Sequence, residues 1–209
     1  MILVFDTETS GLPAWRLPAD HPSQPRLVQL AALLLDDSLE EHACFSAIVR
    51  PDGWTIPKEA SDLHGITTEM ACDLGLPLRF VLSTLVEFAA RIDLRVAHNL
   101  DFDDLIVTAA FKRNGLPHTG WAGGFCTMRA MTPLCKLPGK YDDYKWPKLQ
   151  EAHVHCFGRE FDRAHNAAAD VRACAQIYRW LRGREAALSF ASDDTEEIQT
   201  NLPGDDPNP

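Results

Sequence analysis

Two acidic side chains follow an apolar run at the start of the chain. Residues 2–5 read Ile-Leu-Val-Phe, and Asp6-Thr7-Glu8 comes directly after them. Because successive side chains of a strand point to opposite faces, Asp6 and Glu8 project to the same face. Neighbouring carboxylates repel each other, and a hard divalent cation such as Mg²⁺ offsets that repulsion by accepting oxygen ligands. The pair predicts a metal site, although an isolated Asp-x-Glu is also typical of a solvated strand end.

A second acidic group follows a short apolar stretch at 94–98. The sequence from His98 to Asp103 reads His-Asn-Leu-Asp-Phe-Asp, at a strand-to-helix turn. Sites in α/β sheets tend to lie at this carboxyl edge of the strands. Asp103 would stand near the start of the helix, where the helix dipole favours negative charge. Local chemistry alone leaves Asp101 and Asp104 as competing candidates.

The third group joins a histidine to an aspartate across a predicted helix start. Asn166 suits the N-cap, which leaves His165 just outside the helix and Asp170 one turn inside it. Cys174 and Ile177 share the side of Asp170, so this carboxylate borders the apolar stripe that faces the protein body. A metal or a cationic partner would remove the desolvation cost of the carboxylate. Histidine side chains exchange protons near neutral pH, so His165 is a candidate general base or an ordinary polar residue.

Hydrophobic periodicity indicates which elements position these groups. We expect three strands, helical pieces, and then strands alternating with helices. This order predicts a mixed α/β sheet flanked by helices, and periodicity alone does not choose among such folds. The predicted strands are 1–6, 27–35, 43–49 and 94–98, with a short strand and helix near 125–134; the helices are 58–73 in pieces, 78–91, 103–114, 147–157 and 167–182.

Together the three motifs resemble those of the DnaQ-like DEDDh 3′–5′ exonucleases, a family that includes the proofreading subunit of bacterial replicative polymerase. The resemblance covers about residues 1–182, and it selects Asp103 over its acidic neighbours. His64-Gly65-Ile66 resembles a landmark between the first two motifs. The resemblance implies a ribonuclease H-like fold: a five-stranded mixed sheet of three antiparallel strands followed by parallel ones. Residues 133–147 form an insertion to which the resemblance assigns no role.

The resemblance also implies a mechanism with two Mg²⁺ or Mn²⁺ ions about 3.5–4 Å apart. In it Asp6 bridges both ions, while His165 is the general base that activates water and releases nucleoside 5′-monophosphates. The implied metal ligands are Asp6, Glu8, Asp103 and Asp170. The implied substrate-binding residues are Thr9, Gly11, Leu12, His64 and Asn99, with Leu12 as a wedge against the last bases or simply a turn residue.

The charge of the chain is compatible with such an enzyme. The net charge is −10, but residues 189–209 carry six acidic and no basic side chains, which leaves 20 basic against 24 acidic side chains, or −4, for the rest. Metal ions bound by four carboxylates would bring that body close to neutrality. The resemblance implies the 3′ end of a nucleic acid as the partner, DNA favoured over RNA. We expect an exonuclease domain at 1–188 and a disordered acidic tail at 189–209.

Several alternatives remain open at this stage. No feature separates DNA from RNA substrates, and the fold could serve as a noncatalytic nucleic-acid-binding module. The tail segment 199–203 faintly resembles a peptide that binds the sliding clamp, so a clamp or polymerase partner is a weak alternative to a solubilising tail. We interpret the six cysteines as reduced core thiols rather than ligands of a zinc site at 153–156. A cytoplasmic location without membrane contact is expected, since no apolar run could span a bilayer.

Overall fold

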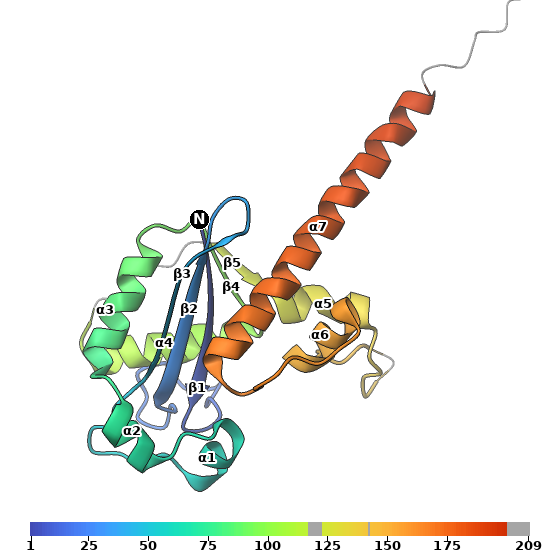
Figure 1. Ribbon diagram of the computed structural model, residues 1–209. Helices are drawn as coiled ribbons and strands as arrows, with labels where there is room; N and C mark the ends of the chain where they lie inside the picture. Colours follow the sequence, from blue (N-terminus) through green and yellow to red (C-terminus); the bar gives the residue numbers. More distant parts are fainter. Residues whose placement is uncertain (117–122, 142, 200–209) are drawn as a thin grey trace, which may run out of the picture.

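The computed structural model describes residues 1–116, 123–141 and 143–199, with side chains described up to residue 185. Five strands form one sheet, and helices cover both of its faces (Figure 1). The strands are β1 (Ile2–Thr9), β2 (Leu27–Leu35), β3 (Glu41–Ile48), β4 (Leu94–Ala97) and β5 (Gly123–Cys126). The helices are α1 (Lys58–His64), α2 (Thr68–Leu74), α3 (Leu78–Ala89), α4 (Leu100–Arg113), α5 (Thr127–Cys135), α6 (Leu149–Phe157) and α7 (Ala167–Gln199).

The sheet has the order β3-β2-β1-β4-β5. Strands β1, β2 and β3 pair antiparallel, whereas β1 with β4 and β4 with β5 pair parallel. This confirms the predicted ribonuclease H-like topology. A register shift between Glu8 and Thr9 interrupts the β1–β2 pairing at the end of β1. Such irregularities re-aim side chains next to functional sites.

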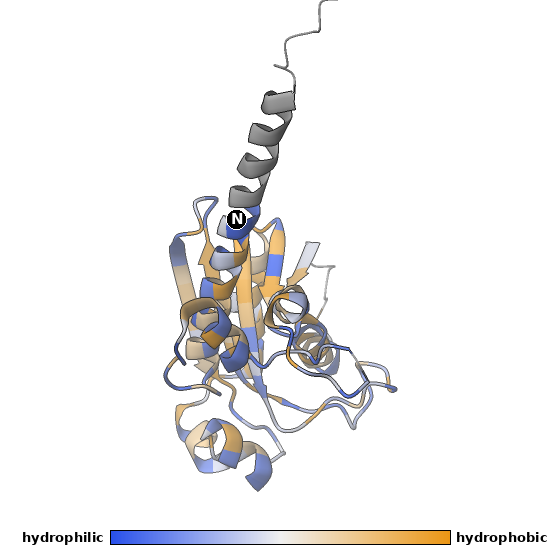
Figure 2. Ribbon diagram, turned by 90° about the vertical axis from the view of Figure 1, so that its right-hand side faces the viewer, coloured by the Kyte–Doolittle hydropathy of each residue, from blue (hydrophilic) through white to orange (hydrophobic). Residues whose placement is uncertain are grey.

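The alternation of β1 divides the core into two layers. Leu3 and Phe5 pack among the apolar side chains of α3 and α4, and Val4 packs on the other face against α7. In Figure 2 the hydrophobic colour is concentrated in the strands that these helices cover. Since the pleat continues beyond Phe5, Thr7 faces the α4 side, whereas Asp6 and Glu8 face α7.

Two smaller groups of helices extend this body. The short helices α1 and α2 bury Ala60, Ile66 and Ala71 against Val28 of β2. Gly65 ends α1 in the left-handed region, with φ of 75°, a conformation that glycine adopts without steric cost. On the opposite side, α5 and α6 pack on the middle of α7 through a separate apolar cluster, consisting of Met131, Ala152, Ile177 and Leu181.

Several element boundaries depart from expectation, among them the end of β1, which lies at Thr9 rather than residue 6. Helix α4 begins at Leu100 rather than 103, and α6 begins at Leu149 because Glu151 accepts a hydrogen bond from the Lys148 backbone N–H in a capping box. Helix α7 continues to Gln199, beyond the predicted end at 182. The domain boundary at 188 stays a prediction, and most of the clamp-like segment 199–203 lies outside the described residues.

The cysteine interpretation holds only in part. All six cysteines are free, but only Cys174 is buried, and Cys44 and Cys72 are exposed, so they are not core thiols. Both ring nitrogens of His153 are occupied by hydrogen bonds, at 2.8 Å to the Arg159 carbonyl and 2.9 Å to Gln176 Oε1. The histidine therefore lacks a free nitrogen for zinc. Among the described residues, none of the helices is both long and apolar enough to cross a membrane.

Candidate active site

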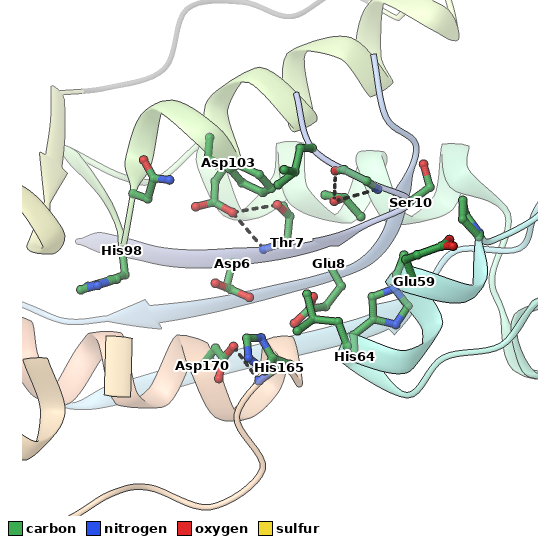
Figure 3. A pocket seen from close by; sticks show the side chains of 18 residues that line it. Asp6, Thr7, Glu8, Ser10, Glu59, His64, His98, Asp103, His165 and Asp170 are labelled. Carbon is green, nitrogen blue, oxygen red and sulfur yellow. Dashed lines mark hydrogen bonds between the residues drawn. The ribbon is translucent and has the colours of Figure 1, made fainter. Parts of the chain in front are cut away.

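A pocket at the carboxyl end of β1 gathers the three motifs. Strand β1 contributes its acidic pair, α4 contributes Asp103, and α7 with the turn before it contributes Asp170 and His165 (Figure 3). The pocket is lined by 18 residues: Asp6, Thr7, Glu8, Thr9, Ser10, Gly11, Leu12, Pro57, Glu59, Ala60, Leu63, His64, His98, Asn99, Phe102, Asp103, His165 and Asp170. Every residue for which the sequence predicts a catalytic or substrate-binding role lines this one pocket.

The structure distinguishes the three aspartates around α4. Asp103 is buried, and its Oδ1 accepts hydrogen bonds from the Thr7 backbone N–H at 3.0 Å and the Thr7 hydroxyl at 2.7 Å. Asp104 forms an ion pair with Arg95 at 2.6 Å, and the exposed Asp101 forms one with Arg129. Two acids are thus neutralised by arginines outside the pocket, and Asp103 is the one held inside it.

The turn before α7 fixes the histidine next to the carboxylates. The His165 backbone N–H donates to Asp170 Oδ2 at 3.1 Å, and His165 has a φ of 64°. A left-handed φ in a residue other than glycine costs roughly 1–3 kcal/mol, and such strain occurs at functional sites where the surroundings enforce it. The hydrogen bond to Asp170 accompanies this conformation here, and the exposed side chain of His165 lines the pocket.

The donor set of the pocket fits a divalent metal. One ligand atom from each of Glu8, His165 and Asp170 lies within 4.8 Å of the others. Asp170 Oδ1 is buried and has no hydrogen-bond partner among the described residues. A buried carboxylate oxygen without a partner is costly, and a hard cation would satisfy it. Asp6 and Asp103 lie outside this compact trio, but they line the same pocket.

Burial raises the pKa of all four carboxyl groups, and repulsion from neighbouring carboxylates adds to the shift for Asp6, Glu8 and Asp103. Burial is the largest cause in each case; it raises the pKa of Glu8 to about 7 and that of Asp170 to about 6. The pKa of Asp6 rises further because Asp103, Asp170 and Glu8 add repulsion. The pKa of Asp103 is also well above its usual value, even though the two Thr7 hydrogen bonds act against the shift. Without a cation, the pocket thus resists full ionisation.

This resistance predicts a pH-dependent stability in the metal-free protein. A carboxyl with a folded pKa above its unfolded value stabilises the fold below about pH 4, and that contribution is lost as the pH rises to about 7. We expect Glu8→Gln to melt at a higher temperature than wild type in chelator, with a difference that grows from pH 5 to pH 8. Thermal melts across that range measure the difference. Saturating Mn²⁺ should reduce it, and a difference independent of pH would contradict the account.

Thr7 predicts a second effect, on the metal. Removing a side chain that orients a metal ligand typically costs 10–100-fold in metal affinity or activity. We therefore expect Thr7→Val to raise the Mn²⁺ concentration for half-maximal activity by about tenfold or more, because Asp103 loses its 2.7 Å bond. Thr7→Ser keeps the hydroxyl and should behave as wild type. Equal Mn²⁺ requirements in the two variants would exclude this positioning role.

The predicted substrate-binding residues surround the carboxylates. The Thr9 hydroxyl donates to the Gly11 carbonyl at 2.6 Å, which folds the chain after β1 into the pocket wall. Leu12 follows and is 87% exposed, as suits a side chain that contacts a ligand. Asn99 adopts a left-handed φ of 86° at the start of α4. His64 Nδ1 accepts the Ile66 backbone N–H at 3.1 Å, so the neutral ring carries its hydrogen on Nε2 and can donate from there.

Eight lining residues had no role in the sequence prediction: Thr7, Ser10, Pro57, Glu59, Ala60, Leu63, His98 and Phe102. Thr7 lies between the two acids of the first motif and gave no signal of its own. Glu59 and Leu63 reach the pocket from α1, whose docking on β2 is a tertiary event. Burial lowers the pKa of His98 to about 4, and its ring bridges the Thr127 hydroxyl and the Pro147 carbonyl, each at 3.0 Å. His98 is therefore a neutral structural bridge.

A ribonuclease H-like sheet with an acidic pocket at its carboxyl edge defines a class of nucleic-acid-cleaving enzymes, and the comparisons with known proteins agree. Residues 3–178 match the RNase_T exonuclease family. The chain therefore belongs to this exonuclease family, as the resemblance to DnaQ-like DEDDh enzymes implied.

Individual relatives are similar over most of the chain. An uncharacterized exonuclease, CP81, of Escherichia phage 186 is 28% identical over 180 residues, which are 81% of this chain and 82% of that protein. Exonuclease I of E. coli in complex with a dT13 oligonucleotide has a TM-score of 0.73 at 21% identity, over 91% of this chain. A zinc-bound form of the same enzyme with single-stranded DNA scores 0.72 at 22% identity, over 90% of this chain. This chain spans only 42% and 41% of those two solved chains.

Proposed function

We propose that the protein is a metal-dependent 3′–5′ exonuclease that releases nucleoside 5′-monophosphates from the 3′ ends of DNA, with single-stranded or frayed ends preferred. The observation that carries the proposal is the convergence of the four predicted metal-binding carboxylates and His165 in a single pocket. Three of these carboxylates are buried there, and the lining of 18 residues named above contains no lysine or arginine. A site of this kind needs cations to work, and phosphodiesters are substrates whose charge such cations neutralise.

The residues that would hold two divalent ions, Mg²⁺ or Mn²⁺, are Asp6, Glu8, Asp103 and Asp170. When bound, such ions supply Lewis-acid stabilisation of the charge that develops on the phosphoryl oxygens. The zinc-bound form of the E. coli relative supports a divalent ion at the corresponding fold. The Thr7 hydroxyl orients Asp103 by a hydrogen bond. Asp170 Oδ2 accepts the His165 backbone N–H, whereas Asp170 Oδ1 has no hydrogen-bond partner among the described residues and is left for a metal ion.

The histidine supplies the proton acceptor. His165 lies at the mouth of the pocket beside Glu8 and Asp170, where it is accessible to water and substrate. In our proposal its imidazole takes the proton of the attacking water as the terminal phosphodiester is cleaved, and general-base catalysis of this kind contributes about 10²–10⁴-fold in rate. One ring nitrogen of His165 lies within 4.8 Å of carboxylate oxygens of Glu8 and Asp170, and the His165 backbone has a left-handed φ of 64°.

The walls of the pocket suit the end of a nucleic-acid strand. The folded segment from Thr9 to Leu12 forms one wall and α1 forms another, with Leu12 and Leu63 exposed by 87% and 58%. We propose that the backbone near Thr9 and Gly11 reads the terminal 3′ hydroxyl, while the leucines contact the last bases and His64 and Asn99 contact the sugar-phosphate. Apolar side chains against bases bind without sequence preference. The oligonucleotide complex of the E. coli relative supports single-stranded DNA as the substrate.

A gel time course tests the reaction directly. A 5′-labelled single-stranded DNA and its RNA counterpart would be incubated with Mg²⁺, Mn²⁺ or chelator, and the products resolved at single-nucleotide spacing. We expect a metal-dependent ladder that shortens from the 3′ end, faster on DNA than on RNA. A 3′-phosphorylated DNA should resist, since the pocket reads a free hydroxyl.

Each other outcome corrects the proposal in a distinct way. Faster loss of RNA would make the enzyme an exoribonuclease, and internal cuts would show an endonuclease. No cleavage of either strand by folded protein with both metals would favour a noncatalytic binding module. Asp101→Asn is the matched control for the acidic residues, because Asp101 is paired with Arg129 outside the pocket.

A further inference from the structure

The segment between α5 and α6 has an unusual composition for this acidic chain. Four of the six lysines and two of the three tyrosines fall within residues 136–148, together with Trp146. The aromatic side chains are exposed, Tyr141 by 77%, Tyr144 by 48% and Trp146 by 62%. We call the described residues 136–141 and 143–148 the aromatic loop. None of the residues assigned to the catalytic pocket comes from it.

The aromatic loop is ordered by its own backbone. Pro138 and Tyr144 form an antiparallel bridge, and the Gly139 N–H donates to the Asp143 carbonyl at 2.8 Å. A Cβ on Gly139 would lie 2.2 Å from Asp143 Oδ1 and 2.5 Å from its carbonyl oxygen, so only glycine fits. Lys140 lies with its Nζ 5.3 Å from the centre of the Tyr141 ring. The exposed rings are therefore displayed on a fixed support.

One contact ties this support to the catalytic pocket. The carbonyl of Pro147, which is buried, accepts the 3.0 Å hydrogen bond from His98 Nε2, and His98 lines the pocket. Trp146 and Lys148 flank Pro147 on either side and are both exposed. In Figure 1 the segment joining α5 to α6 loops out beside these two helices. The segment that carries the rings is thus anchored to the pocket lining through His98.

We propose that the aromatic loop binds the single strand upstream of the 3′-terminal nucleotides, with its rings stacking on successive bases and its lysines contacting the phosphates. This inference rests on the proposed exonuclease function and specifies how its substrate is held. Aromatic rings stack on any base, and interspersed cations follow the backbone, which is how single strands are bound without sequence preference. The rest of the chain is acidic, so the loop offers a local attraction that the net charge of −10 does not.

The lysines remain accessible for this role. All four are exposed, and only Lys145 among them forms an ion pair in the described part of the chain, with Glu151 at 2.6 Å on the surface. Exposed pairs of this kind contribute little stability, so a phosphate can replace the carboxylate at small cost. The acids of the catalytic pocket repel phosphates in the absence of metal, and a second contact surface offsets that repulsion for strands long enough to reach it.

Equilibrium binding of oligonucleotides of two lengths tests the proposal. Fluorescence anisotropy would measure the Kd of a 3-nucleotide and a 12-nucleotide single-stranded DNA, with Ca²⁺ in place of Mg²⁺ to limit cleavage. We expect the combined variant Tyr141→Ala, Tyr144→Ala and Trp146→Ala to raise the Kd of the 12-mer by about tenfold or more, and that of the 3-mer much less. Phe80→Ala, which removes a 56% exposed ring on α3, is the matched control and should leave both constants unchanged.

The lysines give an independent readout. Lys140→Gln should reduce the slope of log K against log salt by about 0.7 for the 12-mer, as expected for one phosphate contact on a single strand. Lys112→Gln, at the end of α4, is its control. Equal 12-mer binding by wild type and the aromatic variant, or equal losses for both lengths, would overturn the inference. Loop-dependent binding without any ladder in the gel assay would instead refute the proposed reaction alone.

Discussion

Asp6→Ala is expected to lower the rate of nucleotide release by about a thousandfold or more. Lewis-acid stabilisation by bound metal is worth several kcal/mol, and each 1.36 kcal/mol is about a factor of ten in rate. Asp6 occupies the position with the most carboxylate neighbours, since Asp103, Asp170 and Glu8 all raise its pKa. The loss should appear in kcat with saturating DNA, measured by release of labelled nucleotide.

The same substitution should leave the fold intact. Removing Asp6 also removes repulsion from a crowded acidic pocket, so the metal-free variant should melt at or above the wild-type temperature. Asp101→Asn, outside the pocket, should keep full activity. A variant that unfolds at ordinary temperature, or one that retains near-normal activity, would count against this pocket as the metal site.

His165→Ala is expected to reduce kcat by about 10²–10⁴-fold, the usual contribution of a general base. Its backbone bond to Asp170 does not need the imidazole, so the carboxylate arrangement should survive the change. The pH–rate profile distinguishes a base from a structural residue. Wild type and the variant should differ in the shape of this profile, because only wild type has an imidazole at this position to accept the proton.

A matched histidine completes this experiment. His42 is exposed on β3 and outside the pocket, so His42→Ala should retain the wild-type rate and profile. Partial recovery of the His165→Ala variant by added imidazole would support proton transfer at this position. If the His165→Ala variant instead bound metal more weakly but had the wild-type pH–rate profile at saturating metal, His165 would be a metal ligand rather than the general base.

Local patterns predicted most of the fold because they are strong in this chain. Strand β2 is a nearly continuous apolar run, which is typical of a strand buried on both faces. The side chains of β1 pack alternately into two core layers, as its short apolar run predicts for a buried strand. The antiparallel-then-parallel order needed the family resemblance, since periodicity does not encode strand pairing. The end of α7 could not be placed, because its later turns lack the apolar stripe that marks the earlier ones.

The site was predictable only at the level of residue types. The three acids in the first turns of α4 look equivalent in sequence, and only their tertiary contacts distinguish them. An arginine of β4 pairs with Asp104 and an arginine of α5 pairs with Asp101, whereas a hydroxyl of β1 binds Asp103. Likewise, the family landmark marks His64 at the end of α1, but no sequence signal marks Leu63, which reaches the pocket because α1 docks on β2. Contacts between elements distant in sequence decided each of these cases.

The wide spacing of the carboxylates along the chain has a consequence for synthesis. Asp6 emerges first and Asp170 last, on either side of most of the folded body. Domains generally acquire their structure as the ribosome extends them, starting from the N-terminus. A nascent chain therefore carries an incomplete acidic set until α7 has been made and packed on β1. Premature termination before residue 170 should yield fragments that lack one of the four pocket carboxylates and are inert.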